Sequence, residues 1–327
     1  MVLENDLKLF QNWIPIRIYW RENLPFVDWC WLGNERFTDS FFDSTIQHRL
    51  TKPFNQLFRH QTPLEFLGEI YETQKGIAPT GFIFHLSRCG STLVSQMLAA
   101  LEQNIVLSEP PPIDAILRLQ IPDETKIEWL KWLVNAFAQP REHEKHFFIK
   151  FDSWNTLDLG LIKRAFPDVP WIFMYRNPVE VIVSHKRQPG MQMIPGQIQQ
   201  LSAGISFEES LQMPPEEFCA RILAKMSESA LNFADDKRGK FINYTQLLEV
   251  FFAEILDHFK LDFNDEELEK MRFAAQFNAK NTGLPFAPDS ESKRKEAGEI
   301  AINSAGKFAD PLYEKLEEIR ESKLFRS

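Results

Sequence analysis

Short apolar runs alternate with amphipathic stretches from Gly81 to the region of residue 244. The runs have strand length and read GFIFH, NIVLS, HFFIKF, PWIFMY and KFINY. Helical patterns separate them, at residues 93–103, 113–119, 124–138, 157–166, 179–188 and 214–239. Apolar strands that alternate with helices predict an α/β fold, in which a central parallel sheet is flanked by helices on both faces.

The first eighty residues do not share this alternation. They hold four of the eight tryptophans and many phenylalanines without a clean period. Aromatic side chains usually bury area in packing, so we expect a helical and irregular extension that packs on the core, with a wall of an acceptor pocket as the alternative. The predicted organisation is therefore an aromatic-rich extension at 1–80 and one α/β domain at 81–327. Residues 189–215, rich in Gly, Pro, Gln and Met, read as a long loop.

The first strand of the α/β pattern runs into a tight polar turn. The stretch Gly81–Leu93 reads GFIFHLSRCGSTL, a strand, a loop and the start of a helix. In such a loop, backbone N–H groups and the positive end of the helix dipole stabilise an anion. The loop therefore predicts a phosphate site, formed by Ser87, Arg88, Cys89, Gly90, Ser91 and Thr92. The Gly-Lys-Ser/Thr of nucleotide triphosphatases is absent, and Arg88 is the only cation.

A second strand-to-helix junction lies at Arg176. Asn177 suits a helix N-cap and Pro178 the first helical position, so Arg176 falls at the carboxyl end of a buried strand. Ser184 follows eight residues later. An arginine fork and a serine hydroxyl at this separation can hold one phosphate jointly, although Arg176 taken alone reads more readily as a partner of a surface carboxylate.

Charged residues mark the ends of the other predicted strands as well. Arg88, Glu109, Lys150 or Asp152, and Arg176 all fall at such ends. Ligands of parallel sheets bind at the carboxyl edge of the strands. These side chains are therefore expected to converge on one site.

The two motifs together resemble the sulfotransferases that use 3′-phosphoadenosine 5′-phosphosulfate, a family with a P-loop-containing fold. HLSRCGSTL resembles the segment that holds the 5′-phosphosulfate in that family, and YRNPVEVIVS resembles the arginine and serine that hold the 3′-phosphate. An arginine in the loop and an acidic residue after the first helix, here Glu109, are similar to the tyrosylprotein-type and bacterial branch. The resemblance covers residues 81–248 well and the first eighty poorly. It implies transfer of a sulfuryl group to a hydroxyl or amine, with adenosine 3′,5′-bisphosphate as product and no metal.

Sulfuryl transfer needs countercharge for the leaving phosphate and a base for the acceptor proton. Arg88 supplies charge, and the resemblance implies that Lys150 touches the transferring group; the alternative is a lysine snorkelling at the surface. Glu109 is the first candidate for the base, with its pKa raised by partial burial, unless it only pairs with Arg88. Asp152 is the second, since it stands where cytosolic relatives carry a histidine. His85 and His185 are expected to be structural.

The cluster SESKRK, at residues 290–295, reads as a solvated loop. The resemblance implies a basic loop over the 3′-phosphate, which makes Lys293 and Arg294 further candidates. Tyr244 is expected to serve in core packing. Leu93 stands where cytosolic relatives carry the tryptophan that stacks the adenine, so Trp154 and Phe286 are the remaining guesses for that role.

Composition limits the partners. A net charge of −9 disfavours nucleic acid and polyanionic sugars, so the expected acceptor is a small molecule or a peptide. Three cysteines show no metal spacing and fit a reducing compartment. The absence of an apolar leader or an eighteen-residue apolar run leads us to expect a cytoplasmic protein without a membrane anchor. The oligomeric state is not predicted.

Two other functions fit parts of these patterns. A P-loop small-molecule kinase would share the strand, loop and helix, but it would need the missing lysine and a magnesium site. A protein that binds adenosine 3′,5′-bisphosphate without catalysis would need the phosphate contacts alone. A requirement for magnesium would favour the first, and binding without turnover the second.

Overall fold

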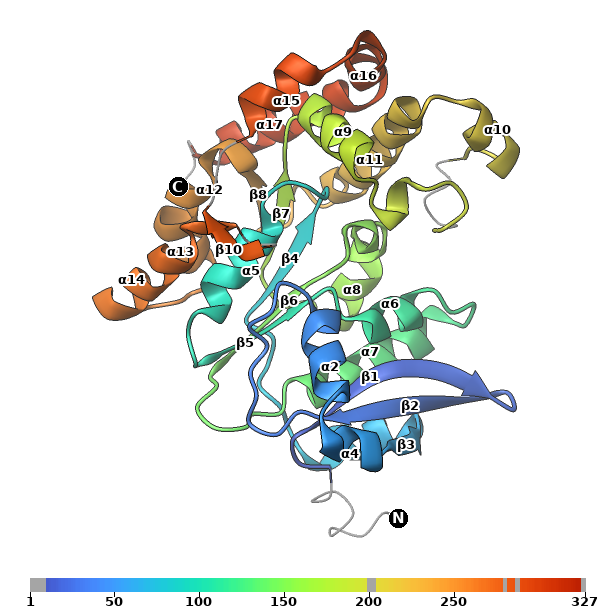
Figure 1. The fold of residues 1–327 in the computed structure, drawn as a ribbon, viewed down its shortest axis with the longest axis vertical. Coiled ribbons are helices and arrows are strands. Elements are labelled where there is room, and N and C mark those ends of the chain that lie inside the picture. The colour runs from blue at the N-terminus through green and yellow to red at the C-terminus, as the bar shows by residue number, and fades with distance from the viewer. Residues whose placement is uncertain (1–9, 199–203, 279–280, 286–288, 325–327) are drawn as a thin grey trace.

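A five-stranded parallel sheet forms the centre of the computed structural model, which describes residues 10–198, 204–278, 281–285 and 289–324 (Figure 1). The order of the strands is β5-β6-β4-β7-β8. Their bounds are Gly81–His85 for β4, Asn104–Ser108 for β5, His146–Lys150 for β6, Trp171–Tyr175 for β7 and Gly239–Asn243 for β8. All neighbouring pairs are parallel, which confirms the predicted α/β fold.

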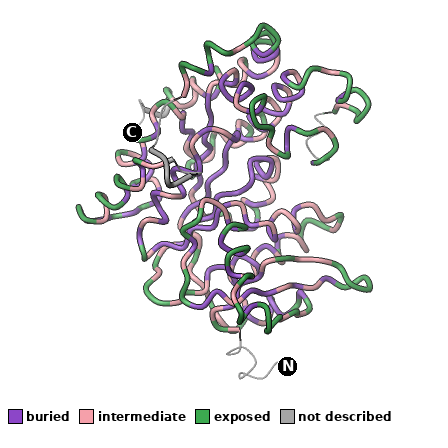
Figure 2. The backbone as a smooth tube through the Cα atoms, viewed as in Figure 1, coloured by how far each residue is buried: buried purple, intermediate pink, exposed green. Residues whose placement is uncertain are grey.

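Both faces of the sheet are buried, as the central strands in Figure 2 show. Side chains alternate along β4, so Phe82 and Phe84 join one hydrophobic core while Ile83 joins the other. The two cores explain why these strands read as unbroken apolar runs. Helices of the central region cover them: α5 Ser91–Ala99, α6 Pro111–Leu117, α7 Asp123–Phe137, α8 Leu159–Ala165, α9 Pro178–Arg187 and α11 Pro215–Leu231.

The helix predicted to reach Gly239 ends earlier, at Leu231. Turns follow it, and Asp236 within them accepts a hydrogen bond from the indole of Trp171 at 2.9 Å and pairs with Lys163. This anchor leads the chain directly into β8, which a continued helix would not do.

The N-terminal segment contains a sheet that the sequence did not reveal. Strands β1 (Trp13–Arg21), β2 (Leu24–Trp31) and β3 (His60–Pro63) form an antiparallel three-stranded sheet beside helices α2 Phe42–Leu50, α3 Pro53–Leu57 and α4 Glu65–Thr73. The prediction of a helical and irregular extension was therefore wrong for the strands. The two-residue turn is Glu22-Asn23, with φ of 50° and 65°, and it lacks the glycine that normally signals such a hairpin.

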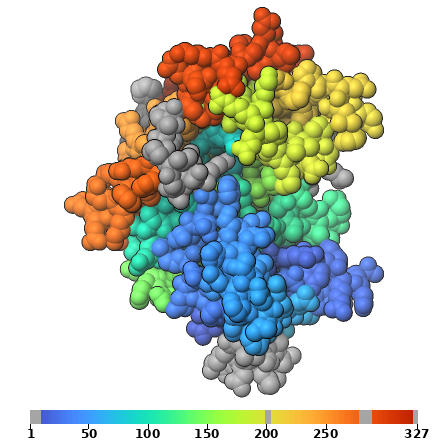
Figure 3. Space-filling view, viewed as in Figure 1, coloured from blue at the N-terminus to red at the C-terminus, as the bar shows by residue number. Residues whose placement is uncertain are grey.

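This segment covers part of the central domain. In Figure 3 its blue surface lies over the lower half of the visible face. Arg36 donates from its guanidinium to the carbonyls of Ala99 and Leu101, at 2.7 and 2.5 Å. The extension is thus joined to the end of α5 by hydrogen bonds.

Two segments predicted as loops contain helices. Residues 189–215 include the short turn η2 (Met191–Met193) and helix α10 (Phe207–Gln212), whose Ser206 and Glu209 form a capping box. SESKRK begins helix α15 (Ser290–Glu296), because its charges form i,i+4 pairs, such as Glu291 with Lys295 at 2.6 Å.

The remaining C-terminal elements lie partly beside α5, where Figure 1 shows α13 and α14, and partly near β8, where it shows α17. They are η4 Tyr244–Gln246, α12 Leu247–Val250, η5 Phe251–Ile255, α13 Leu256–His258, α14 Asp265–Ala274, β9 Phe277–Asn278, β10 Asn281–Pro285, α16 Glu299–Ser304, η6 Ala305–Ala309 and α17 Asp310–Leu324. Among the described residues, no helix has the length and apolar character needed to span a bilayer.

Candidate active site

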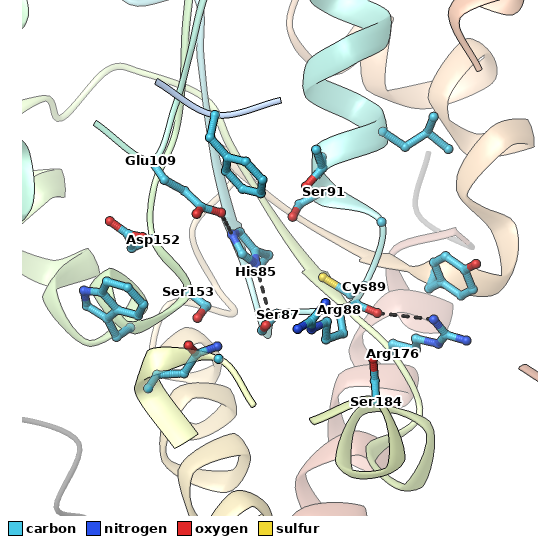
Figure 4. Close-up of a pocket in the computed structure, with 18 of the residues that line it drawn as sticks. His85, Ser87, Arg88, Cys89, Ser91, Glu109, Asp152, Ser153, Arg176 and Ser184 are labelled. Atoms are coloured by element: carbon cyan, nitrogen blue, oxygen red, sulfur yellow. Dashed lines mark hydrogen bonds and ion pairs between the residues drawn. The ribbon is translucent and has the colours of Figure 1, made fainter. Parts of the chain in front are cut away.

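A cavity of about 460 Å³ opens at the carboxyl ends of the parallel strands (Figure 4). It lies beside β4, which has β5 and β6 on one side and β7 and β8 on the other. The strand order therefore reverses direction at β4, and parallel sheets bind their ligands at such a point. Its walls include most of the predicted site residues: Ser87, Arg88, Cys89, Gly90, Ser91, Thr92, Glu109, Asp152, Arg176, Ser184 and Lys293.

The loop between β4 and α5 has an unusual backbone. Ser87, Arg88 and Gly90 have φ of 71°, 53° and 84°. Positive φ costs about 1 to 3 kcal/mol at a non-glycine residue, so tertiary contacts must hold Ser87 and Arg88 in place. At Gly90 a Cβ atom would lie 2.6 Å from the Leu247 side chain, which excludes larger residues. Because Gly90 is the N-cap, no side chain caps α5, and Gly90, Ser91 and Thr92 at its start line the cavity.

Arg88 and Cys89 play different parts in this loop. Arg88 donates to the carbonyl of Gln188 at 2.8 Å, and burial lowers the pKa of its guanidinium against the opposing field of Glu109. The thiol of Cys89 is buried and lies 3.3 Å from the Met174 carbonyl, and burial raises its pKa to about 11. Because its sulfur is buried, Cys89 can contact an anion in the loop only through its backbone.

The second motif folds as the sequence predicts. The Asn177 side chain caps α9 by accepting from the N–H groups of Val179 and Glu180, at 3.1 and 3.4 Å. Arg176 precedes the cap and is 3% exposed, and Ser184 lines the same cavity. The Nη1 atom of Arg176 donates to the Arg88 carbonyl at 3.3 Å, so the two predicted motifs meet.

Carboxylates hold the guanidinium of Arg176. Its Nε atom donates to Glu180 at 2.6 Å, and its Nη2 atom donates to Asp289 at 2.6 Å and to the Ser290 hydroxyl at 3.0 Å. Asp289 lines the cavity and also pairs with Lys293 at 2.7 Å. Two cations thus converge on the Asp289 carboxylate. Sequence reasoning missed this residue, because no local signal marks a contact across 113 positions.

Tyr244 packs against the second hydrophobic core, as predicted, and also lines the cavity. The guanidinium of Arg176 lies 4.0 Å from its ring centroid, a contact that the sequence did not predict. Arg294 pairs with Glu180 at 2.7 Å and is not among the residues that line the cavity.

Glu109, Lys150 and His85 form a polar cluster on the other side of the loop. Lys150 is fully buried, with its ammonium 2.9 Å from Glu109 Oε1 and 3.4 Å from the Thr92 hydroxyl. The alternative of a snorkelling surface lysine is thus wrong. His85 Nε2 lies 3.5 Å from the same Glu109 oxygen (Figure 4). Glu109 has φ of 58°, and its N–H donates to the Lys150 carbonyl at 2.7 Å, which fixes the two residues side by side.

The two candidate bases differ in charge state. Burial opposes ionisation of Glu109, but Lys150 and His85 outweigh it and hold its pKa well below the ordinary value. The expected rise in the pKa of Glu109 was therefore wrong, because a strand-end lysine compensates the buried charge. Burial and the charges of Glu109 and Asp114 raise the pKa of Asp152 well above its usual range. The pKa of Glu109 is thus depressed and that of Asp152 is raised, so Glu109 ionises more readily than Asp152.

Several wall residues came from no prediction. Phe41 of the N-terminal segment, Met191 and Gln192 of η2, and Ser153 line the cavity. Trp154, one of the two guesses for adenine stacking, is in the wall and donates from its indole to Asp114 at 2.7 Å. The other guess, Phe286, lies outside the described residues. The ring centroid of Phe41 lies 4.9 Å from the Lys150 ammonium nitrogen. The N-terminal segment therefore contributes a residue to the site.

Within the part of the chain that the structure describes, no group of three or more His, Cys, Asp or Glu side chains could hold a metal ion. No protein-family model matches the chain, and no curated protein matches it.

Solved structures similar to this chain include several sulfotransferases. The sulfotransferase domain from the curacin biosynthetic pathway matches with a TM-score of 0.42 and 14% identity, over 71% of this chain and 98% of that domain. A sulfotransferase from Mycobacterium avium gives 0.43 and 11%, over 75% and 80%. A mouse sulfotransferase complexed with PAP gives 0.39 and 16%, over 80% and 91%. The function proposed below rests on the residues of the site itself.

Proposed function

We propose that this chain transfers a sulfuryl group from 3′-phosphoadenosine 5′-phosphosulfate to a hydroxyl or amine of an acceptor. One observation carries the proposal: the loop around Arg88 and the pair Arg176 and Ser184, which lie far apart in the sequence, line one cavity and touch each other. A donor with phosphates on both the 3′ and the 5′ oxygens of one ribose needs two neighbouring anion sites of this kind.

The donor's two phosphate groups have different partners in the proposal. The uncapped N-terminus of α5 and the N–H groups of the loop suit the 5′-phosphosulfate. Arg176, Ser184 and Lys293 suit the 3′-phosphate, which would replace the Asp289 carboxylate as the anion between the two cations. The ring of Tyr244 packs against the guanidinium of Arg176 and helps to hold it in place.

Transfer itself falls to the polar cluster. The acceptor oxygen bonds to sulfur while the bond from sulfur to the bridging 5′-phosphate oxygen breaks, and the phosphate leaves with that electron pair. Glu109 is ionised and takes the acceptor proton. Arg88, which lines the cavity, and Lys150, which is buried beside the Thr92 hydroxyl, stabilise the charge that builds on the leaving phosphate. Asp152 is the alternative base, because burial and the neighbouring carboxylates raise its pKa and a carboxylate with a higher pKa accepts a proton more strongly once it is ionised.

The buried thiols support a reducing compartment in this proposal. Cys30, Cys89 and Cys219 are free and buried, which suits a reducing environment such as the cytoplasm. The acceptor is a small molecule or a peptide in this proposal, and the chain acts without a metal.

Incubating the protein with donor labelled in its sulfur and a metabolite extract tests the proposal. The expected result is label in a new ester or amide, together with an equal amount of adenosine 3′,5′-bisphosphate. Hydrolysis to sulfate alone, or no consumption of donor with any extract fraction, would contradict it.

Replacing Arg176 with lysine should weaken adenosine 3′,5′-bisphosphate by about 10- to 100-fold, while adenosine 5′-phosphate binds almost as before. Lysine keeps a positive charge beside Glu180 but loses the planar fork, and a charge-assisted hydrogen bond contributes about 1.5 to 3 kcal/mol. Calorimetric titration of both ligands measures the difference. Arg187→Lys is the matched control, since Arg187 pairs with Glu296 outside the cavity. Equal losses for both ligands would remove Arg176 from a 3′-phosphate site.

Replacing Asp289 with asparagine should have the opposite effect and tighten adenosine 3′,5′-bisphosphate by about 10-fold. The amide no longer competes as an anion for Arg176 and Lys293, so the phosphate displaces a weaker partner. Adenosine 5′-phosphate should not gain, and its titration is the control. Unchanged or weaker binding of the bisphosphate would show that Asp289 is not in the path of the 3′-phosphate.

A further inference from the structure

Cavity residues that are not assigned to either phosphate include His85, which ends β4 and is 4% exposed. Its two ring nitrogens face different partners. Nδ1 lies 3.0 Å from the backbone nitrogen of Ser87, in the phosphate loop. Nε2 lies 3.1 Å from the Phe151 carbonyl and 3.5 Å from Glu109 Oε1. One ring therefore touches the loop, the end of β6 and the candidate base.

The partners determine which nitrogen carries the proton. A backbone N–H can only donate, so Nδ1 must accept from Ser87 and be unprotonated. Nε2 faces only oxygen acceptors in these contacts, so it carries the hydrogen. His85 is thus a neutral imidazole that directs its N–H toward Phe151 and Glu109.

Ser87 makes this contact from the positive-φ part of the loop. The backbone conformation that shapes the phosphate loop therefore also fixes the tautomer of His85. Glu109 in turn is faced by Lys150 from β6, by His85 from β4, by Arg88 from the loop and by Asp152 beyond β6. Of these, Lys150 and His85 reach its Oε1 atom.

We infer that His85 is a positioning residue, whose Nε2–H keeps the Glu109 carboxylate turned toward the phosphate loop for the transfer step. The inference rests on the proposed function for its role in catalysis, since Glu109 is the base there. Its geometric part, the link from Ser87 through the imidazole to Glu109, stands on the contacts alone. His85 moves no proton in this account.

Two substitutions test the contacts of the two ring nitrogens separately. In His85→Asn the amide oxygen can still accept from Ser87, but the donor toward Glu109 is lost. In His85→Gln the amide N–H reaches the position of Nε2, but the acceptor for Ser87 is lost. His146→Asn is the matched control. His146 is the first residue of β6, at the amino ends of the strands, and it lies outside the cavity.

The expected pattern is a loss of turnover confined to one variant. His85→Asn should lower kcat by about 10²-fold, with KM for the donor and the affinity for adenosine 3′,5′-bisphosphate unchanged, because a misplaced base affects the reacting atoms and not donor binding. His85→Gln should restore most of the turnover. The carboxyl pKa of Glu109, followed by ¹³C NMR and assigned with Glu109→Gln, should rise in His85→Asn and fall back in His85→Gln.

Three results would overturn the inference. These are native turnover in His85→Asn, a Glu109 pKa that is the same in both variants, or equal losses of bisphosphate affinity and melting temperature in both. The last would mean that the ring only packs the loop. A native protein that binds the bisphosphate but transfers nothing would refute the proposed function separately, and the NMR measurement on Glu109 would still decide the role of His85.

Discussion

Replacing Glu109 with glutamine is expected to lower turnover by about 10²- to 10⁴-fold, the usual contribution of a general base. Affinity for adenosine 3′,5′-bisphosphate should stay at least as high as in the native protein, because the amide has the same shape and Lys150 keeps its charge for the phosphates. Steady-state kinetics and calorimetry measure the two quantities.

Asp152→Asn is the matched control for this variant. Asp152 lines the same cavity but is not the base in the proposed assignment, so its amide should retain most of the activity. If Glu109→Gln turned over normally while Asp152→Asn were inactive, the base would be Asp152 and the proposed assignment would be wrong. Loss of donor binding in both variants would instead make the carboxylates orienting groups for Arg88 and Lys150.

Replacing Lys150 with methionine is expected to abolish measurable transfer and to lower the free energy of unfolding by about 3 kcal/mol at neutral pH. Removing one partner of a buried ion pair leaves the other charge uncompensated, at a cost of about 3 to 5 kcal/mol, which the partial exposure of Glu109 reduces. Urea denaturation measures the unfolding free energy. Lys240→Met is the control, since Lys240 pairs with Glu254 at a half-buried site and should cost less than about 1 kcal/mol.

The free energy of unfolding lost in Lys150→Met should be smaller at acidic pH than at neutral pH. In the native protein the depressed pKa of Glu109 contributes stability above the ordinary glutamate pKa of about 4.3, and this contribution disappears as pH falls through the folded value. Without Lys150 the pKa of Glu109 rises, and protonation then relieves the buried charge. The difference between native protein and variant should therefore shrink below about pH 4. The double variant Lys150→Met, Glu109→Gln should regain much of the lost unfolding free energy, because no buried charge is left unpaired. A difference in unfolding free energy that is constant with pH would mean that Lys150 stabilises by packing alone.

The sequence predicted the central sheet and the two strand-to-helix junctions at Arg88 and Arg176 because their signals are local. Each strand of the sheet is an apolar run that is buried on both faces, and Asn177-Pro178 sets the start of α9 within one segment. Parallel strands then bring their carboxyl ends together, so Arg88, Glu109 and Arg176 meet without any contact being known in advance.

Features that depend on contacts between distant residues were missed. Asp289 reaches Arg176 across more than a hundred positions, and Tyr244 stacks under the same guanidinium. The charge state of Glu109 depends on Lys150 and His85, which come from two other strands. The hairpin of β1 and β2 was missed for another reason, because its turn uses Glu22 and Asn23 in place of glycine.

Calorimetric titration of the native protein with adenosine 3′,5′-bisphosphate, in the presence of a chelator, tests the central claim most directly. The account predicts binding to a single site without any metal, at least 10-fold tighter than adenosine 5′-phosphate, since a charge-assisted contact to the 3′-phosphate contributes about 1.5 to 3 kcal/mol. Binding of ATP that requires magnesium, with no response to adenosine 3′,5′-bisphosphate, would contradict it and identify the cavity as that of a phosphate-transferring enzyme.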